Sequence, residues 1–436
     1  MINWIKRILG LNKTIYKLSE VFVPGGDPKL TYNPRSDKKI EEKVKRASEN
    51  LSKLLMVTGP TKSGKTVVTN KIFSRDTSIW FDCGAYEKED DLWEFILDEL
   101  DGYTSLQKTT HKTESRSASG KFVGESPLRN MKGEIGGKVE VKDEDGSIKG
   151  RSISAKNKAI NILRNSKVPL VLDDFHYLPR EDQGRIVRAI KGLVFGGFPV
   201  VFIAIPHRRL DATKVEREMT GRVEVVNIPT WEEYELKTIP ETGFRLLNIE
   251  IDNKIIDRLT EEALGSPHLM QDFCYYLCDM KGINETQKNL VKIKEEEETF
   301  LQDLFTKVAE NTGKIMFQKL ARGPRQRSDR MERRLKNGIA TDIYSVVLFA
   351  LANMKPGLVT IEYEELRTQI REIVVDKAPQ AHEVTRVLDH MSRIAADDES
   401  STPVIDWESE ERTLHITDPF FAYYLRWGEE LMEIRN

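Results

Sequence analysis

A glycine-rich turn between two apolar segments constrains this chain more than any other feature. The turn reads, in order, Gly59, Pro60, Thr61, Lys62, Ser63, Gly64, Lys65 and Thr66. It fits the pattern G-x-x-x-x-G-K-[ST], the P-loop, whose glycines let the backbone fold around an anion with its N–H groups turned inward. The apolar run Leu54–Val57 predicts a strand before it, and Val67–Phe73 predicts a helix whose dipole favours the same anion. A glycine turn with incidental lysines is the alternative, and this context argues against it.

The side chains of the turn indicate a nucleotide phosphate site. Lys65 is placed to reach the β- and γ-phosphates, and the Thr66 hydroxyl to ligate Mg²⁺. A second apolar run, Val168–Leu172, ends in Asp173 and Asp174, and in a parallel sheet both acids would lie at the edge where a nucleotide binds. We expect Asp173 to hold Mg²⁺ with its water shell and Asp174 to polarise an attacking water. A solvated strand end is the weaker alternative, because two separate segments indicate one site.

Predicted strands and helices alternate as far as Pro229, which indicates an α/β fold, a parallel sheet with helices on both faces. The other expected strands are 78–83, 200–205 and 224–228, and the other expected helices are 37–52, 90–100, 158–164 and 183–195. A polar tract over 104–156 interrupts this pattern. Its weak alternation at Lys132–Val141 predicts a β-hairpin in a flexible insert.

After Pro229 only helices are expected, at 231–239, 253–263 and 267–279 and through a charge-dense stretch over 283–338. Helices at 342–352, 363–373 and 382–395 and a hairpin over 403–416 then follow the pattern of a winged helix. The predicted organisation is an N-terminal helical segment, a P-loop core, an all-helical lid, a charged helical connector and a winged-helix domain, at 1–30, 31–229, 230–282, 283–338 and 339–436.

Composition excludes several classes of protein. The 436 residues are 39% hydrophobic, enough for real cores, so wholesale disorder is excluded. No apolar run approaches the roughly 18–20 residues of a membrane helix. The 3 cysteines cannot make a disulfide framework, and no His/Cys cluster has zinc spacing. We therefore expect a cytoplasmic protein without a transmembrane segment.

The order of these motifs resembles the P-loop ATPases of the AAA+ and STAND type, in particular their origin-recognition-like and archaeal-ATPase-like branch. The resemblance covers roughly residues 30–280, and the terminal winged helix more loosely. It implies ATP with Mg²⁺ as the ligand, and the pair Asp173-Asp174 resembles the STAND pattern of slow, switch-like hydrolysis. The chain has no Asn-Lys-x-Asp stretch that would read guanine, which favours ATP over GTP.

The resemblance also assigns roles to residues on either side of the P-loop. Tyr32 and Arg35 occupy the segment that contacts the base in such proteins, and a plain loop is the alternative. His207 and Arg208 follow the strand predicted at 200–205, where these families carry a sensor of the γ-phosphate. They are equally well explained as ordinary loop residues.

Two later motifs are assigned in the same way. Arg222, just before the strand predicted at 224–228, resembles the arginine finger that reaches a neighbour's nucleotide. An ion pair with Glu216 or Glu218 is the alternative. Gly265, Ser266 and Pro267, followed by His268, resemble the Gly-x-Pro motif that packs a lid over the nucleotide. Many relatives carry a sensor arginine nearby, where this chain has His268. A helix cap is the alternative here.

These features leave two main hypotheses for function. One is a STAND-like switch that forms a homo-oligomer and acts through a separate effector or sensor protein, since the chain has no repeat sensor. Bacterial defence systems use such split arrangements. The other is an ATPase that remodels or loads DNA. The expected winged helix and the basic stretch Arg322–Lys336 favour this second hypothesis. A metabolic kinase is disfavoured, because no acceptor-binding residues are recognisable.

Charge weighs against nucleic acid as the partner of the C-terminal domain. Residues 341–436 hold 9 Lys/Arg and 19 Asp/Glu, a balance of −10, which repels a phosphate backbone. The expected recognition helix carries Arg386 and Arg393 but also Glu383 and Asp389. The insert, with 11 Lys/Arg and 7 Asp/Glu over 104–156, is the other segment that could touch DNA.

Overall fold

The computed structural model describes residues 14–49, 52–100, 154–166, 168–205, 221–294, 298–324, 330–357, 359–375, 377–396 and 403–435. The chain divides into two compact units. The α/β unit comprises Lys39–Gly59 and Lys65–Ile228, and the helical unit comprises Met1–Lys38, Pro60–Gly64 and Pro229–Asn436. The P-loop tip, Pro60–Gly64, thus belongs to the helical unit although the elements on both sides of it belong to the α/β unit.

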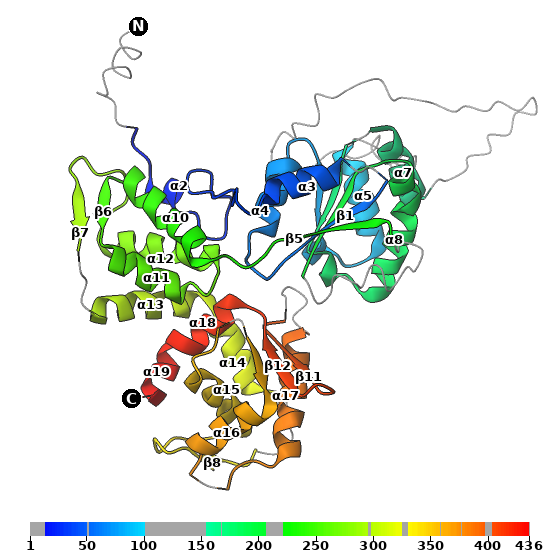
Figure 1. Cartoon of the computed structure of the whole chain (residues 1–436). Coiled ribbons are helices and arrows are strands. Elements are labelled where there is room, and N and C mark those ends of the chain that lie inside the picture. Colours follow the sequence, from blue (N-terminus) through cyan, green and yellow to red (C-terminus); the bar gives the residue numbers. More distant parts are fainter. Residues whose placement is uncertain are drawn as a thin grey trace, which may run out of the picture. The chain divides into compact units, whose positions relative to one another are not determined.

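The α/β unit is built on a five-stranded sheet in which all strands are parallel (Figure 1). In spatial order the strands are β2 (Ile79–Asp82), β3 (Leu170–Asp173), β4 (Val200–Ala204), β1 (Leu54–Thr58) and β5 (Val223–Asn227). The predicted parallel sheet is confirmed. Because the strands share one direction, β1, which leads into the P-loop, and β3, which leads into Asp174, end at the same edge.

Helices cover both faces of this sheet, as the alternating helices and strands predicted. Leu54 and Met56 of β1 share a core with residues of α5 (Glu89–Glu99), α7 (Ala155–Ser166) and α8 (Arg180–Phe195). Leu55 and Val57 share the opposite core with residues of α3 (Ile40–Ser48) and α4 (Lys65–Ile72). Successive side chains of a strand point to opposite faces, so a strand buried on both faces is apolar throughout.

The first part of the helical unit is a helical bundle that holds the N-terminal segment. Its helices are α2 (Leu18–Val21), α10 (Glu233–Leu246), α11 (Asn253–Glu262), α12 (Pro267–Met280) and α13 (Glu298–Thr312). Phe22 packs edge-on against Phe244, with ring centroids 5.3 Å apart. A Cβ at Gly243 would lie 2.2 Å from the Phe22 ring, so only glycine admits this contact.

The second part of the helical unit contains the three helices and the hairpin that the winged-helix prediction required. After α14 (Lys314–Arg322), the helices are α15 (Ile343–Asn353), α16 (Tyr363–Ile373) and α17 (Ala381–Ala396). The hairpin strands are β11 (Ile405–Glu408) and β12 (Thr413–Ile416), and β10 (Thr360–Glu362) adds a third antiparallel strand beside β12. Two further helices, α18 (Pro419–Trp427) and α19 (Glu429–Arg435), follow.

Some details of the prediction were wrong. The segment after Pro229 is not purely helical, because β6 (Ile249–Ile251) pairs in parallel with β7 (Val291–Ile293), and β8 (Arg333–Arg334) pairs with β9 (Ala340–Thr341). Strands of two or three residues are too short to show an alternation in sequence. The helix expected at 37–52 is the shorter α3, which begins after Lys39 in a left-handed conformation. The hairpin expected at Lys132–Val141 lies outside the described residues.

Two expectations from composition can be compared with the structure. Cys83, Cys274 and Cys278 are free and buried. Within the described ranges, none of the helices combines the length and the apolar character that crossing a membrane requires.

Candidate active site

The P-loop joins the end of β1 to the start of α4. Lys62 and Gly64 both have positive φ, 61° and 90°, which turns the backbone sharply before the helix. At Gly64 a side chain would be strained by this conformation, whereas Lys62 adopts it with a Cβ. The Ser63 N–H donates to the Pro60 carbonyl at 3.3 Å and closes the turn. The first N–H groups of α4 have no partner within the helix, so they are available to an anion in the turn.

The P-loop lysine and threonine occupy the first turn of α4. Lys65 is 7% exposed, and the Thr69 hydroxyl donates to its carbonyl at 2.8 Å. The Thr66 hydroxyl donates to Oδ1 of Asp173, the last residue of β3, at 3.2 Å. The structure therefore brings together the two residues expected to hold Mg²⁺, although they are far apart in sequence.

The chemistry of this pair suits Mg²⁺. Burial, together with the negative charge of Asp174, raises the pKa of Asp173 to about 6. Burial disfavours the ionised form of this carboxyl group, so a nearby cation stabilises that form more than it would at an exposed site. A hydroxyl and a carboxylate are hard oxygen ligands of the kind that Mg²⁺ takes beside phosphate and water.

Asp174 is held in a conformation that aspartate adopts more readily than most residues. Its φ is 52°, its N–H donates to Oδ1 of Asp173 at 3.1 Å, and its carbonyl accepts from Tyr177 N at 2.9 Å. The side chain is 39% exposed, which leaves the carboxylate accessible from solvent. Asp173 is buried and Asp174 is not, so the two acids have different surroundings.

The sequence interpretation missed two residues at this edge of the sheet. His176 is buried, and its Nδ1 lies 4.0 Å from Oδ1 of Asp174. Asp82 ends β2 directly opposite Asp173 in the strand register and adds a third carboxylate. The rule that located Asp173 would have found Asp82 as well, since both end apolar strands of one parallel sheet. His176 has no comparable signal, because a histidine three residues after a strand is common.

Arg35, which the resemblance assigns to the base, forms a buried ion pair within the helical unit. Its Nε and one terminal nitrogen each donate to the Glu235 carboxylate at 2.8 Å, and the two side chains are 3% and 1% exposed. The guanidinium also donates to the carbonyls of Pro229 and Thr230 at 2.8 and 3.0 Å. These four hydrogen bonds use four of the five N–H donors of the guanidinium. Tyr32, three residues earlier, is partly buried.

The segment before α12 is a helix cap with a close backbone approach. Ser266 caps α12 by accepting from Leu269 N, and Pro267 is its first residue. Gly265 has φ 70°, and a Cβ there would lie 2.4 Å from the Thr230 side chain. His268 follows, with Nε2 3.7 Å from Oδ2 of Asp272. Burial first, and then the Lys62 charge, lower the pKa of His268 to about 4, so its imidazole is neutral at neutral pH.

The remaining predicted residues follow β4 or precede β5. His207 and Arg208 lie outside the described residues, as do Glu216 and Glu218. Arg222 places its guanidinium carbon 5.4 Å from the centroid of the Phe195 ring, which is 71% exposed. Its carbonyl accepts from Leu54 N at 2.9 Å, which places Arg222 beside the start of β1. The P-loop follows the other end of that strand.

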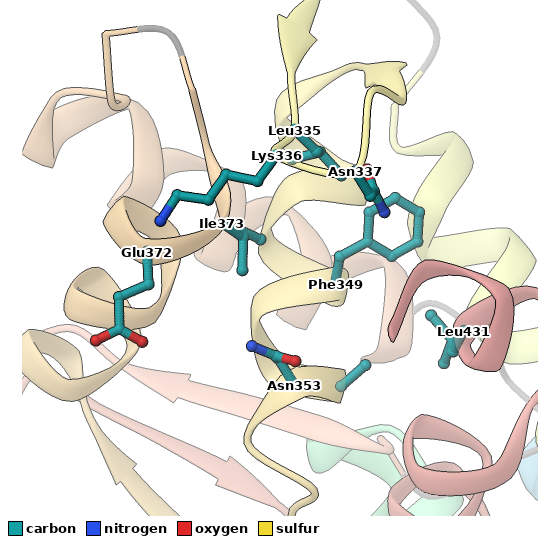
Figure 2. Close-up of a pocket in the computed structure, with 9 residues that line it drawn as sticks. Leu335, Lys336, Asn337, Phe349, Asn353, Glu372, Ile373 and Leu431 are labelled. Atoms are coloured by element: carbon teal, nitrogen blue, oxygen red, sulfur yellow. The ribbon is translucent and has the colours of Figure 1, made fainter. Parts of the chain in front are cut away.

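A separate pocket of about 240 Å³ lies in the second part of the helical unit (Figure 2). Phe349 and Asn353 of α15 face it from one helix, and Leu431 comes from α19. Lys336 and Glu372 contribute opposite charges to its lining. None of the predicted site residues lines this pocket, so it is distinct from the P-loop.

No protein-family model and no curated protein matches this chain. Among solved structures, a Walker-type ATPase of Pyrococcus abyssi matches at a TM-score of 0.52 and 15% identity, over 91% of this chain and 96% of that one. The ORC2 protein of Aeropyrum pernix in its ADPNP-ADP complexes matches at 0.46 and 12%, over 97% and 99%. A STAND protein with a tetratricopeptide repeat sensor from Pyrococcus horikoshii matches at 0.36 and 12%, over 92% and 44%. The first likeness shows that the chain has the fold of a Walker-type P-loop ATPase, as predicted.

Proposed function

We propose that this chain binds ATP with Mg²⁺ at the P-loop, hydrolyses it slowly, and works as a nucleotide-driven switch that assembles with its own copies. The observation that carries the proposal is the contact between Thr66 and Asp173 beside the P-loop. It supports a site in which two unrelated segments supply the two protein ligands of one cation. The fold shared with a Walker-type ATPase supports the same reaction class.

Each residue has a distinct task in this proposal. The P-loop N–H groups and the Lys65 ammonium bind and orient the phosphates. Thr66 and Asp173 hold Mg²⁺, which when bound neutralises charge on the phosphate oxygens. Asp174 accepts a hydrogen bond from the attacking water and orients it, and the buried His176 limits the movement of the Asp174 carboxylate.

The position of Arg222 supports action on a neighbouring copy. β1 runs from Leu54, beside Arg222, to Thr58, beside the P-loop. Four strand residues at about 3.3 Å each separate the two ends by roughly 13 Å, about twice the reach of an arginine side chain. Arg222 therefore suits the nucleotide of a second copy better than that of its own. A separate effector or sensor protein and a role in bacterial defence complete the proposal.

The alternative, an ATPase acting on DNA, has weaker support. Within the basic stretch 322–336, Arg330 forms an ion pair with Asp342. Arg333 is buried and pairs with Glu383 at 3.0 Å. Two of the cations that suggested a DNA surface are thus used inside the protein, and the acidic balance of residues 341–436 remains.

The Asp174→Asn variant is expected to bind ATP as the wild type does and to lose turnover by at least about a hundredfold, because the amide cannot accept a proton from water. Nucleotide affinity by calorimetry and phosphate release by a coupled assay measure the two effects. Asp90→Asn, on the first turn of α5, is the matched control and should leave both unchanged. Full turnover in Asp174→Asn would place the base elsewhere.

Arg222→Ala is expected to lower turnover only under conditions in which the wild type assembles, since an arginine supplied in trans can be worth about 10³–10⁵ in rate. Light scattering with ADP, with a non-hydrolysable ATP analogue and without nucleotide gives the molar mass, and turnover is measured across the same protein concentrations. Phe195→Leu separates loss of the ring contact from loss of the charge. An equal loss of turnover in monomeric Arg222→Ala would reject the role in trans.

A further inference from the structure

The P-loop tip is held by the helical unit through its backbone. The Ser63 carbonyl accepts a hydrogen bond from Trp231 Nε1 at 2.9 Å. Trp231 is fixed in turn, since the Arg35 guanidinium carbon lies 4.9 Å from the centroid of its ring. The conformation of the tip therefore depends on residues of the helical bundle.

The tip is also held through the side chain of Lys62. Its Nζ lies 5.1 Å from the centroid of the Phe420 ring in α18, within the range of a cation–π interaction. The charge of the same ammonium also acts on two carboxyl groups, those of Asp272 and Asp418. Burial raises the pKa of Asp272 to about 7 and also raises that of Asp418, and the Lys62 charge opposes both shifts.

Within the part of the chain that the structure describes, no cation other than Lys62 balances these two carboxyl groups. Asp272 is 7% exposed, and its Oδ2 has no hydrogen-bond partner among the described residues. The nearest basic group, His268, is kept neutral by its burial. Asp418 caps α18 by accepting from Phe421 N at 2.9 Å, and it forms no ion pair with any of the described residues. Lys62 is the cation whose charge stabilises both carboxylates.

The helix that carries Phe420 is firmly attached to the helical bundle. The Tyr423 hydroxyl donates to the Phe305 carbonyl of α13 at 3.0 Å. Trp427 Nε1 donates to the buried Glu262 of α11 at 2.8 Å. The helix α18, which carries Phe420 near its N-terminal end, therefore links the bundle to the C-terminal helices.

We propose that Lys62 is a latch: the Phe420 ring of α18 and the charges of Asp272 and Asp418 hold its ammonium, and a bound polyphosphate competes with them for it. The inference rests on the proposed binding of nucleotide at the P-loop. Lys62 is exposed, so phosphate can reach it without unfolding the tip. Release of Lys62 by the phosphates frees the N-terminal end of α18, so the C-terminal part of the chain responds to the nucleotide.

Asp418→Asn tests the latch, because asparagine keeps the helix cap and removes the charge. Its affinity for ADP is expected to rise about tenfold, since one carboxylate no longer competes for Lys62. Asp252→Asn, which makes the same change at the cap of α11, should leave the affinity unchanged. In a Lys62→Met background the gain from Asp418→Asn should fall below about twofold. A gain that persists there would reject the latch and indicate simple repulsion between Asp418 and phosphate.

A measurement without nucleotide separates the latch from the proposed function. Amide hydrogen exchange over residues 59–66 should be faster in Asp418→Asn and in Phe420→Leu than in the wild type and in Asp252→Asn. If the wild type binds no ADP but amide exchange over residues 59–66 changes in this way, the proposed function is rejected. The contact of Lys62 with α18 is then supported. If the wild type binds ADP, and both variants keep its affinity and its exchange rates, the latch is rejected and the proposed function stands.

Discussion

Lys65→Ala is expected to lower the affinity for ATP by at least about a hundredfold while the chain keeps its fold. The ammonium makes charge-assisted hydrogen bonds to phosphate, each worth about 1.5–3 kcal/mol, and a loss of about 2.7 kcal/mol is a hundredfold change. Alanine is the best helix former, so α4 should not be weakened at this position. Calorimetric titration with a non-hydrolysable ATP analogue and Mg²⁺ measures the affinity, and thermal unfolding checks the fold.

The same helix supplies the control for this experiment. Lys71→Ala removes an exposed lysine from the last turn of α4, beyond the P-loop. It should bind the analogue within about twofold of the wild type, because a surface charge at that distance is largely screened. Wild-type affinity in Lys65→Ala would refute the assignment of the phosphate site, and with it the proposed function.

Arg35→Ala is expected to lower the free energy of unfolding by about 3–5 kcal/mol. Removing one partner of a buried ion pair leaves the other charge without compensation, here the carboxylate of Glu235, which is 1% exposed. The substitution also removes the donors to the Pro229 and Thr230 carbonyls at the start of the helical bundle. Urea denaturation followed by tryptophan fluorescence reports this loss.

Two comparisons make this result specific. The double variant Arg35→Met with Glu235→Met should cost less than Arg35→Ala alone, because no charge is left buried. Lys53→Ala breaks the pair with Glu224, whose side chains are 34% and 41% exposed, and should cost less than about 1 kcal/mol. A cost below 1 kcal/mol for Arg35→Ala would mean that the carboxylate of Glu235 reaches water in solution.

The parts of the fold that could be predicted are those that a local pattern encodes. The apolar run Leu54–Val57 located β1, which ends one residue later at Thr58, because a strand buried on both faces is mostly apolar. The same pattern located Asp173 at the end of β3. The contact between Thr66 and Asp173 then followed from the rule that parallel strands end at one edge, without knowledge of which strands are neighbours.

The parts that could not be predicted depend on contacts between distant segments. Nothing near Arg35 in the sequence shows that Glu235, 200 residues later, neutralises it, so the resemblance alone gave it a nucleotide role. The helix α18 was missed as well, because its short apolar segment has no polar face to show a period. The cap Asp418 followed by Pro419 was the available signal for where it begins. The domain boundaries inside the helical unit and the roles of Tyr32, His207 and Arg208 stay predictions.

The membership of the P-loop tip in the helical unit has a consequence for how this protein is made. A ribosome releases the tip early, but Trp231 emerges later and Phe420 only near the end of the described chain. The strands of the α/β unit and the P-loop are therefore synthesised before Phe420, one of the groups that hold the P-loop tip. The contacts that hold the P-loop tip are therefore complete only after α18 has been synthesised.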